Sequence, residues 1–107
     1  MSDAAGLPYG LPPYVIDRFR ALFRAWPQVE RVVLYGSRAK GNYRKGSDID
    51  LCLEGETLGI AELLKLDAEI DDLLLPWKVD LSLRHNIDNP DLLAHIDRVG
   101  IPIYPSG

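Results

Sequence analysis

The spacing of apolar residues along the chain predicts helices that alternate with strands. Apolar side chains recur every three or four positions in some stretches and every second position in others. Pro27 and Pro76 are expected to stop the first two helices. Thr57 is the expected N-cap of the second helix, and Asn89-Pro90 starts the third. The helical spacing covers residues 14–25, 58–75 and 89–100.

Four shorter runs have strand character. The first is apolar on both faces, which is typical of an interior strand. The second and third alternate with period two, so that Asp48 and Asp50 share one face and Asp80 lies on the corresponding face of its own strand. Pro102 in the last run favours an edge position. These predicted strands are residues 31–35, 48–54, 77–83 and 101–104.

The order of these elements predicts an α/β (α+β) fold with a small mixed sheet and helices packed mainly on one face. A helix connects the second and third strands, which favours a right-handed crossover and parallel pairing. The first two strands are joined by a short loop at residues 36–47 and are expected to be antiparallel. Residues 1–13, rich in Gly and Pro, are interpreted as an irregular arm, and residues 14–107 as a single domain.

The length and composition of the chain limit the classes of function that it can have. With 107 residues the chain can form one small domain. Its formal charge of −4 argues against a nucleic-acid partner, although Arg38, Lys40, Arg44 and Lys45 make a local basic cluster. The single cysteine, Cys52, excludes an intramolecular disulfide. Neither a membrane-spanning apolar run nor a signal peptide is found, so we expect a cytoplasmic protein without a membrane partner.

Carboxylates on neighbouring strands are the strongest chemical feature. Asp48 and Asp50 point the same way at a separation of about 7 Å along the strand. Like charges at that distance call for a cation, and carboxylates together with phosphate oxygens are typical ligands of divalent ions. Asp80 can bring a third carboxylate to the same pocket. The pattern predicts a site for two metal ions and phosphoryl chemistry, with Asp48, Asp50 and Asp80 as metal ligands and catalytic residues.

A phosphate-binding loop is predicted directly after the first strand. Gly36 allows the backbone to approach a ligand closely, and Ser37 can donate its hydroxyl to a phosphate oxygen. Arg38 and Lys40 supply positive charge where a triphosphate would lie. The alternative interpretation is a surface turn followed by a strand with a solvated acidic face. We assign no metal or acid–base role to His85 or His95, and interpret Trp77 and Cys52 as packing residues, with Cys52 half-buried.

Gly36-Ser37 and Asp48-Ile49-Asp50, separated by ten residues, resemble the Gly-Ser…Asp-x-Asp signature of the DNA polymerase beta nucleotidyltransferase superfamily. The segment Leu-Tyr-Gly-Ser-Arg-Ala-Lys-Gly resembles the corresponding segment in the minimal, single-domain branch of this superfamily, the minimal nucleotidyltransferases (MNT). The resemblance covers about residues 14–104 if Asp80 is the third acid. It implies the nucleotidyltransferase fold, ATP as substrate and Mg²⁺, with two ions. Lys40 stands where many relatives carry arginine.

The resemblance also implies a biological setting. The minimal branch is often the antitoxin partner of a small helical HEPN-domain toxin, to whose tyrosine it is thought to attach AMP. We therefore expect transfer of a nucleoside monophosphate, AMP from ATP, to a hydroxyl of such a partner protein. A homodimer could instead complete the acceptor site. Two other functions remain open: a non-catalytic module that neutralises a toxin by complex formation, and a transferase that acts on a small molecule.

Overall fold

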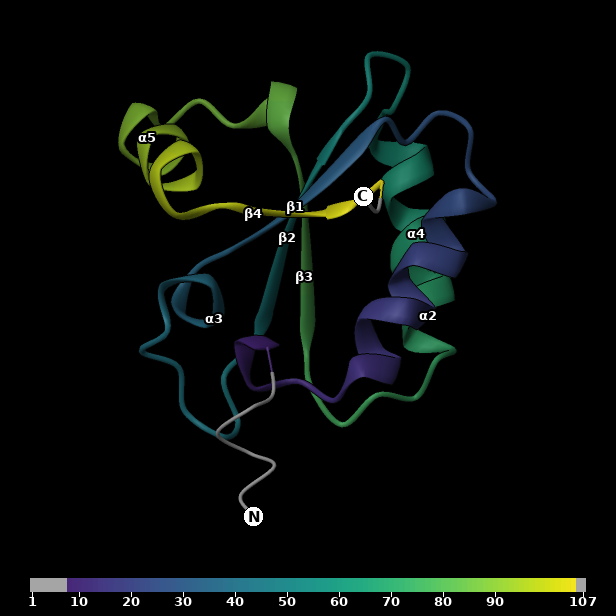
Figure 1. The fold of residues 1–107 in the computed structure, drawn as a ribbon. Helices are drawn as coiled ribbons and strands as arrows, with labels where there is room; N and C mark the ends of the chain where they lie inside the picture. The colour runs from purple at the N-terminus through teal and green to yellow at the C-terminus, as the bar shows by residue number, and fades with distance from the viewer. Residues whose placement is uncertain (1–7, 106–107) are drawn as a thin grey trace.

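The computed structural model describes residues 8–105, and its strands form one mixed sheet (Figure 1). A short 3-10 helix, η1 (Pro8–Gly10), precedes the first long helix, and another, η2 (Arg84–Asn86), follows the third strand. The strands are β1 (Arg31–Tyr35), β2 (Ile49–Glu54), β3 (Val79–Leu83) and β4 (Ile101–Tyr104). The α-helices are α2 (Pro13–Arg24), α3 (Ser37–Lys40), α4 (Ile60–Asp71) and α5 (Pro90–Val99).

The sheet has the strand order β3-β2-β1-β4. β1 pairs with β2 and with β4 in antiparallel orientation, whereas β2 and β3 are parallel. The predicted mixed sheet is therefore confirmed, including the parallel pair that α4 connects. β4, which contains Pro102, lies at an edge as expected.

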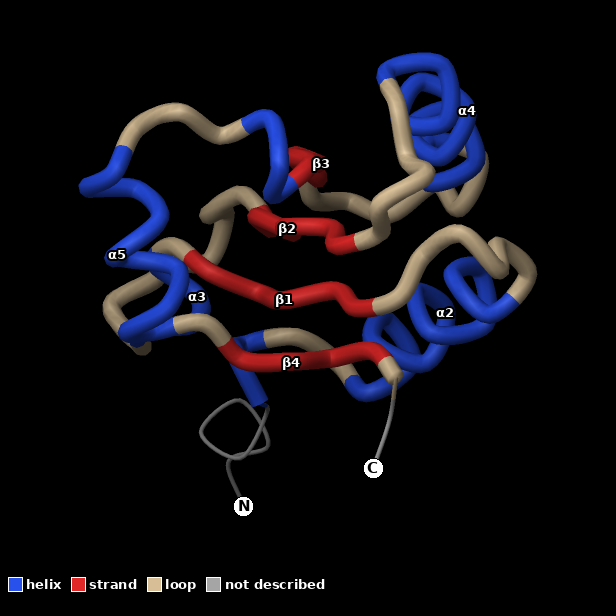
Figure 2. The backbone as a smooth tube through the Cα atoms, turned by 90° about the horizontal axis from the view of Figure 1, so that it is seen from above, coloured by secondary structure: helices blue, strands red, loops and turns tan. Residues whose placement is uncertain are grey.

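Helices cover the two faces of the sheet unequally. α2 and α4 pack on one face and enclose the main core, whereas α5 lies on the opposite face (Figures 1 and 2). Alternation along the strands decides which side chains enter the main core: Val32 and Leu34 of β1 do so, while Val33 and Tyr35 pack with Ile96 of α5. Asp50 and Asp80 have the same parity as Cys52 and therefore lie on the side of α5.

The predicted bounds of the second long helix were wrong at both ends, and β3 begins at Val79 and not at Trp77. The second long helix begins at Ile60 with Gly59 as its N-cap, so Thr57 does not cap it. The Glu62 carboxylate accepts the backbone N–H of Gly59 at 2.8 Å and stabilises the helix start in place of a threonine hydroxyl. The helix ends at Asp71, before Pro76, and Leu74 adopts a left-handed φ of 54°. The third helix starts as predicted, because the Asn89 side chain accepts the N–H groups of Asp91 and Leu92.

The predicted arm at residues 1–13 is only partly visible, because residues 1–7 lie outside the described part of the chain. Residues 8–10 form η1, and Leu11 is fully buried in the main core. Across residues 8–105, the helices are too short or too polar to cross a bilayer.

Candidate active site

Three neighbouring strands place polar side chains on one patch of the sheet, here called the acidic face and consisting of Tyr35, Asp50, Asp80 and Ser82. Asp50 is the register partner of Asp80 on the parallel strand β3 and of Tyr35 on the antiparallel strand β1. Register partners lie side by side across a sheet, so these side chains project together. Asp48 precedes the first residue of β2 and is exposed. The structure thus brings Asp50 and Asp80 together, with Asp48 at the entrance.

Gly36 directly follows β1 and lies against Asp50. Its φ of 79° and ψ of −158° belong to a region that only glycine occupies without strain. A Cβ atom at this position would be 2.3 Å from Oδ2 of Asp50, too close for any real contact. Glycine is therefore required both for the backbone conformation and for the approach of the Asp50 carboxylate. Ser37 comes next and starts the single helical turn α3.

Negative charge accumulates at Asp50. Partial burial raises the pKa of this carboxyl above its usual value, and the charges of Asp80 and Asp48 raise the pKa further, while His95 lowers it. The ion pairs within residues 8–105 involve Arg20, Arg31 and Arg84, and none of them includes an acid of this site. Three carboxylates without a cationic partner are an unfavourable arrangement unless a cation binds there.

The acids do not form a closed metal cage. Within the described part of the chain, no three His, Cys, Asp or Glu side chains are close enough together to hold an ion by themselves. This agrees with the chemistry of Mg²⁺, which is usually bound by one or two carboxylates together with substrate phosphates and water. Asp50 and Asp80, with Asp48 at the entrance, fit such an open site.

Arg38 has a different role from the one its position in the sequence suggests. Its side chain is only 2% exposed, and its guanidinium donates to the carbonyl oxygens of Tyr9, Lys45 and Ser47 at 2.9–3.2 Å. The rings of Tyr43 and Trp77 lie 5.3 and 5.8 Å from it. Because its donors are used inside the protein, Arg38 holds the loop that leads to Asp48. Of the two predicted cations, only Lys40 is exposed.

Two residues of the acidic face, Tyr35 and Ser82, were not predicted as site residues, and neither was the polar contact of His95. The Tyr35 hydroxyl is 3.3 Å from Oγ of Ser82, so this pair spans β2 beside Asp50. Nε2 of His95, on α5, accepts the backbone N–H of Gly36 at 3.3 Å, and its ring meets the Tyr35 ring edge-on. Ser82 could have been found from its alternation with Asp80. His95 carried no such signal, because the sequence does not say which sheet face α5 covers.

Comparison with protein families decides the classification. The family model described as polymerase beta, nucleotidyltransferase, matches residues 18–106. The chain belongs to this nucleotidyltransferase family. Two relatives in Methanocaldococcus jannaschii, MJ1217 and MJ0126, are named as proposed protein adenylyltransferases. MJ1217 is 27% identical over 84 residues, which cover 78% of this chain and 85% of the relative. MJ0126 is 31% identical over 71 residues, which cover 65% of this chain and 71% of the relative.

Solved structures share the fold of this nucleotidyltransferase. One chain of a toxin–antitoxin complex crystallised with AMP-PNP superposes with a TM-score of 0.70 at 22% identity, covering 85% of this chain and 73% of that one. A chain from the complex of a tri-AMPylated Shewanella oneidensis HEPN toxin with its MNT antitoxin superposes with a TM-score of 0.66 at 19% identity. The match covers 88% of this chain and 72% of that one. These likenesses confirm the predicted nucleotidyltransferase fold.

Proposed function

We propose that this nucleotidyltransferase transfers AMP from ATP to a hydroxyl group of a partner protein. The proposal is carried by one observation: Asp50 and Asp80 are register partners with no cationic partner among the described residues, and Asp50 lies against Gly36. An acidic pair beside a glycine-led turn suits a metal-bound triphosphate. The names of MJ1217 and MJ0126 support a protein as the acceptor and adenylate as the transferred group.

Each residue has a role in this proposal. Asp48, Asp50 and Asp80 hold Mg²⁺, with two ions when ATP is bound. Bound Mg²⁺ would neutralise the triphosphate and make the α-phosphate more electrophilic. Ser37 holds phosphate oxygens through its backbone N–H and its hydroxyl, at the close turn that Gly36 allows, and Lys40 adds positive charge from the exposed end of α3. Arg38 contributes indirectly by holding the loop before Asp48.

The reaction is an in-line displacement at the α-phosphate. The acceptor hydroxyl oxygen forms a bond to the α-phosphorus, its proton passes to the carboxylate of Asp80, and the bond to the β-phosphate oxygen breaks. Pyrophosphate leaves with the electron pair of that bond, and AMP remains on the acceptor. Asp80 suits the proton-accepting role because it lies on the edge strand β3, where an acceptor can approach.

The partner we propose is a small helical HEPN-domain protein, for which this chain acts as the antitoxin. Support comes from the solved complexes of the same fold, which join an MNT antitoxin to a HEPN toxin, one of them tri-AMPylated. AMP on a hydroxyl of the partner would add negative charge and bulk to its surface.

The test of this function is the transfer of label from ATP labelled on its α-phosphate to protein. The wild-type chain, Mg²⁺ and an extract of the source cells should give a labelled band, and Asp50→Asn should give none. Asp80→Asn should also lose transfer. Glu54→Gln is the matched control, because Glu54 ends the same strand and makes only an exposed ion pair with Arg31. Full labelling by Asp50→Asn would contradict the metal role.

The outcome without label is also informative. If the wild-type chain labels no protein but still captures a small partner and neutralises its toxicity, the chain acts as a binding module. The Asp48→Asn, Asp50→Asn double variant would then neutralise as well as the wild type. Under the proposed function, the same double variant binds the partner with unchanged affinity and fails to neutralise it.

A further inference from the structure

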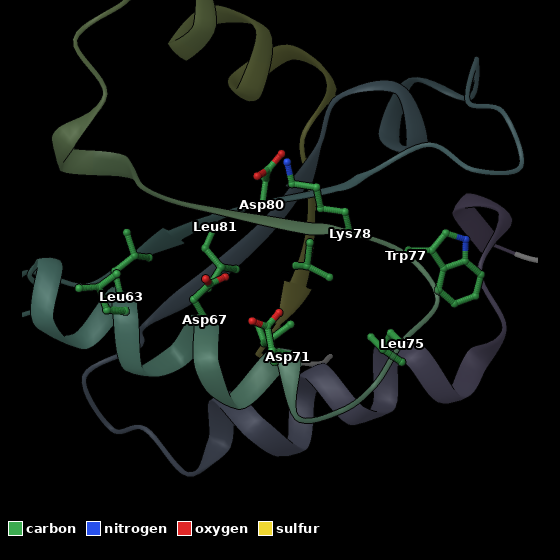
Figure 3. Close-up of a pocket in the computed structure, with 11 residues that line it drawn as sticks. Leu63, Asp67, Asp71, Leu75, Trp77, Lys78, Asp80 and Leu81 are labelled. Atoms are coloured by element: carbon green, nitrogen blue, oxygen red, sulfur yellow. The ribbon is translucent and has the colours of Figure 1, made fainter.

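A groove runs between α4 and β3, next to the acidic face but on the other side of the strand (Figure 3). Its cavity has a volume of about 340 Å³. Figure 3 shows Leu81 pointing from β3 toward α4, whereas Asp80 projects from the opposite side of the strand. Leu64, on the groove wall, is 65% exposed. The apolar lining is completed by Leu63, Ile70, Leu75, Trp77 and Val79.

The outer edge of β3 borders this groove and is open. β3 is the terminal strand of the sheet, and no strand within residues 8–105 pairs with its other side. The carbonyl of Lys78 accepts the N–H of Ile49 at 2.9 Å and so faces β2. Because backbone groups alternate in direction along a strand, Val79 and Leu81 turn their N–H and C=O groups to the open edge. These groups can pair with an added extended segment.

The charges around the groove select the kind of segment. Asp67 and Asp71 extend from α4 into it, and Asp80 and Lys78 flank it on the β3 side. Asp67 and Asp71 face the apolar floor directly, whereas Lys78 and Asp80 project together from the opposite side of β3, so the groove carries an excess of negative charge (Figure 3). Lysine and arginine side chains match this surface, because their aliphatic stems cover apolar atoms while their heads meet carboxylates.

We infer that the groove binds an extended, lysine- or arginine-rich segment of the acceptor protein, which pairs with β3 as an additional strand. The inference rests on the proposed function and names where its protein substrate docks. A strand beside β3 passes within one strand spacing of Asp80, so that a hydroxyl on the segment is brought to the acids. Main-chain pairing supplies affinity in this mode, and the pockets for alternate side chains supply specificity.

A second copy of the chain is a poorer occupant of the same edge. Two β3 edges paired around a twofold axis would bring Asp67 and Asp71 of both copies to one interface. The whole chain carries a formal charge of −4, so the repulsion is not offset elsewhere. Charge complementarity therefore favours a basic partner.

The binding test uses the Asp50→Asn chain, in which transfer is blocked, and short fluorescent peptides of alternating pattern that contain one tyrosine and differ only in Lys, Glu or Ser at the polar positions. The Lys peptide should bind most tightly. The Asp67→Lys, Asp71→Lys variant should weaken it by about tenfold or more. Asp72→Lys, at the C-cap of the same helix and outside the groove, is the control and should change affinity by less than about twofold.

Strand pairing is tested separately with a Lys peptide that is N-methylated at every second amide. One of the two possible methylation registers should abolish binding, because it removes the N–H groups that face β3. Equal binding of the Glu and Lys peptides would overturn the inference. So would unchanged affinity in the Asp67→Lys, Asp71→Lys variant or in both methylated peptides.

Failure of the docking inference is distinguishable from failure of the function. If the Asp67→Lys, Asp71→Lys variant labels the acceptor protein from ATP as fast as the wild type does, the docking site is wrong and the function stands. If the Lys peptide binds as predicted but the wild-type chain labels neither peptide nor protein, docking stands without the transfer. The affinity for a non-hydrolysable ATP analogue should be the same in the variant and the wild type.

Discussion

The residues of the acidic face hold carboxylates close together, which favours the binding of a cation and lowers the stability of the ligand-free fold. Asp50 lies between Asp80 on one strand and Tyr35 on the other, and Gly36 has no side chain that would displace it. Burial also raises the pKa of Tyr35, a shift that its contact with Ser82 opposes and the charge of Asp50 increases. Groups of one sign are thus held together before any ligand arrives, as in preorganised sites.

Gly36→Ala tests the closest contact of the site. The left-handed φ of 79° costs an alanine on the order of 1–3 kcal/mol, and its Cβ would force the Asp50 carboxylate to move. A displacement of about 1 Å can cost on the order of 100-fold in rate, so AMP transfer should fall by that factor. Label transfer and urea denaturation are the measurements.

Two other glycines separate backbone strain from displacement of Asp50. Gly41 has a φ of 91° but open space around its Cβ position, so Gly41→Ala should destabilise the protein and retain transfer. Gly46 has neither a positive φ nor a close neighbour at its Cβ position, so Gly46→Ala should leave stability and transfer unchanged. Loss of transfer in Gly41→Ala equal to that in Gly36→Ala would mean that strain alone explains the effect.

Asp50→Asn should stabilise the metal-free protein while it abolishes transfer. The pKa of Asp50 is higher in the folded chain than its usual value, so ionisation of this group costs folding free energy above the folded pKa. The amide removes that charge, and in partly exposed surroundings the gain is a few tenths to about 1 kcal/mol. Thermal unfolding in chelator at neutral pH measures it. A lower melting temperature would contradict the repulsion.

At the level of elements, the sequence predicted types and order well and boundaries less well. The helix predicted at residues 58–75 begins at Ile60 because Glu62 caps the Gly59 N–H, a contact that competes with the expected Thr57 cap. Propensity does not decide between two such caps only a few residues apart. The face covered by α5 was not predictable either, since an amphipathic helix shows that one side is buried but not against what.

The loop between β1 and β2 depends on Arg38. As a charged residue after a Gly-Ser pair, Arg38 matched a phosphate-binding pattern. Its burial and its hydrogen-bond partners depend on how the loop folds, so they could not be predicted from the spacing of residues. Burial lowers the pKa of Arg38, and its contacts with three carbonyl oxygens offset the cost of burying its charge. Arg38 thus contributes to holding the loop before Asp48, together with the Ser47 hydroxyl, which accepts the N–H of Arg44, and the Trp77 indole, which donates to the carbonyl of Lys45.

Arg38→Met should destabilise the protein by about 3 kcal/mol or more, because it removes the donor of the Tyr9 and Ser47 carbonyls and leaves the Lys45 carbonyl only its contact with Trp77. Hydrogen exchange at residues 41–47 should accelerate. Lys40→Met, which changes an exposed cation, should leave stability unchanged and weaken ATP binding. If Arg38→Met instead weakens ATP binding with no loss of stability, Arg38 belongs to the nucleotide site.

For the whole molecule, the parts combine because the crossover through α4 makes β2 and β3 parallel neighbours and so brings Asp50 beside Asp80. The sequence predicted this meeting from the alternation of two strands and the helix between them. It could not predict that His95 would approach the same face from α5, or that the outer edge of β3 would border a groove with its own charge. Both depend on packing between distant segments.

Metal-dependent nucleotide binding at the acidic face is tested most directly by calorimetric titration of a non-hydrolysable ATP analogue into the purified chain, with Mg²⁺ and with chelator. Binding should require Mg²⁺ and be lost in the folded Asp48→Asn, Asp50→Asn double variant, while Glu54→Gln should bind like the wild type. Equal affinity in chelator, or in the double variant, would show that the acidic face does not hold a metal-bound nucleotide.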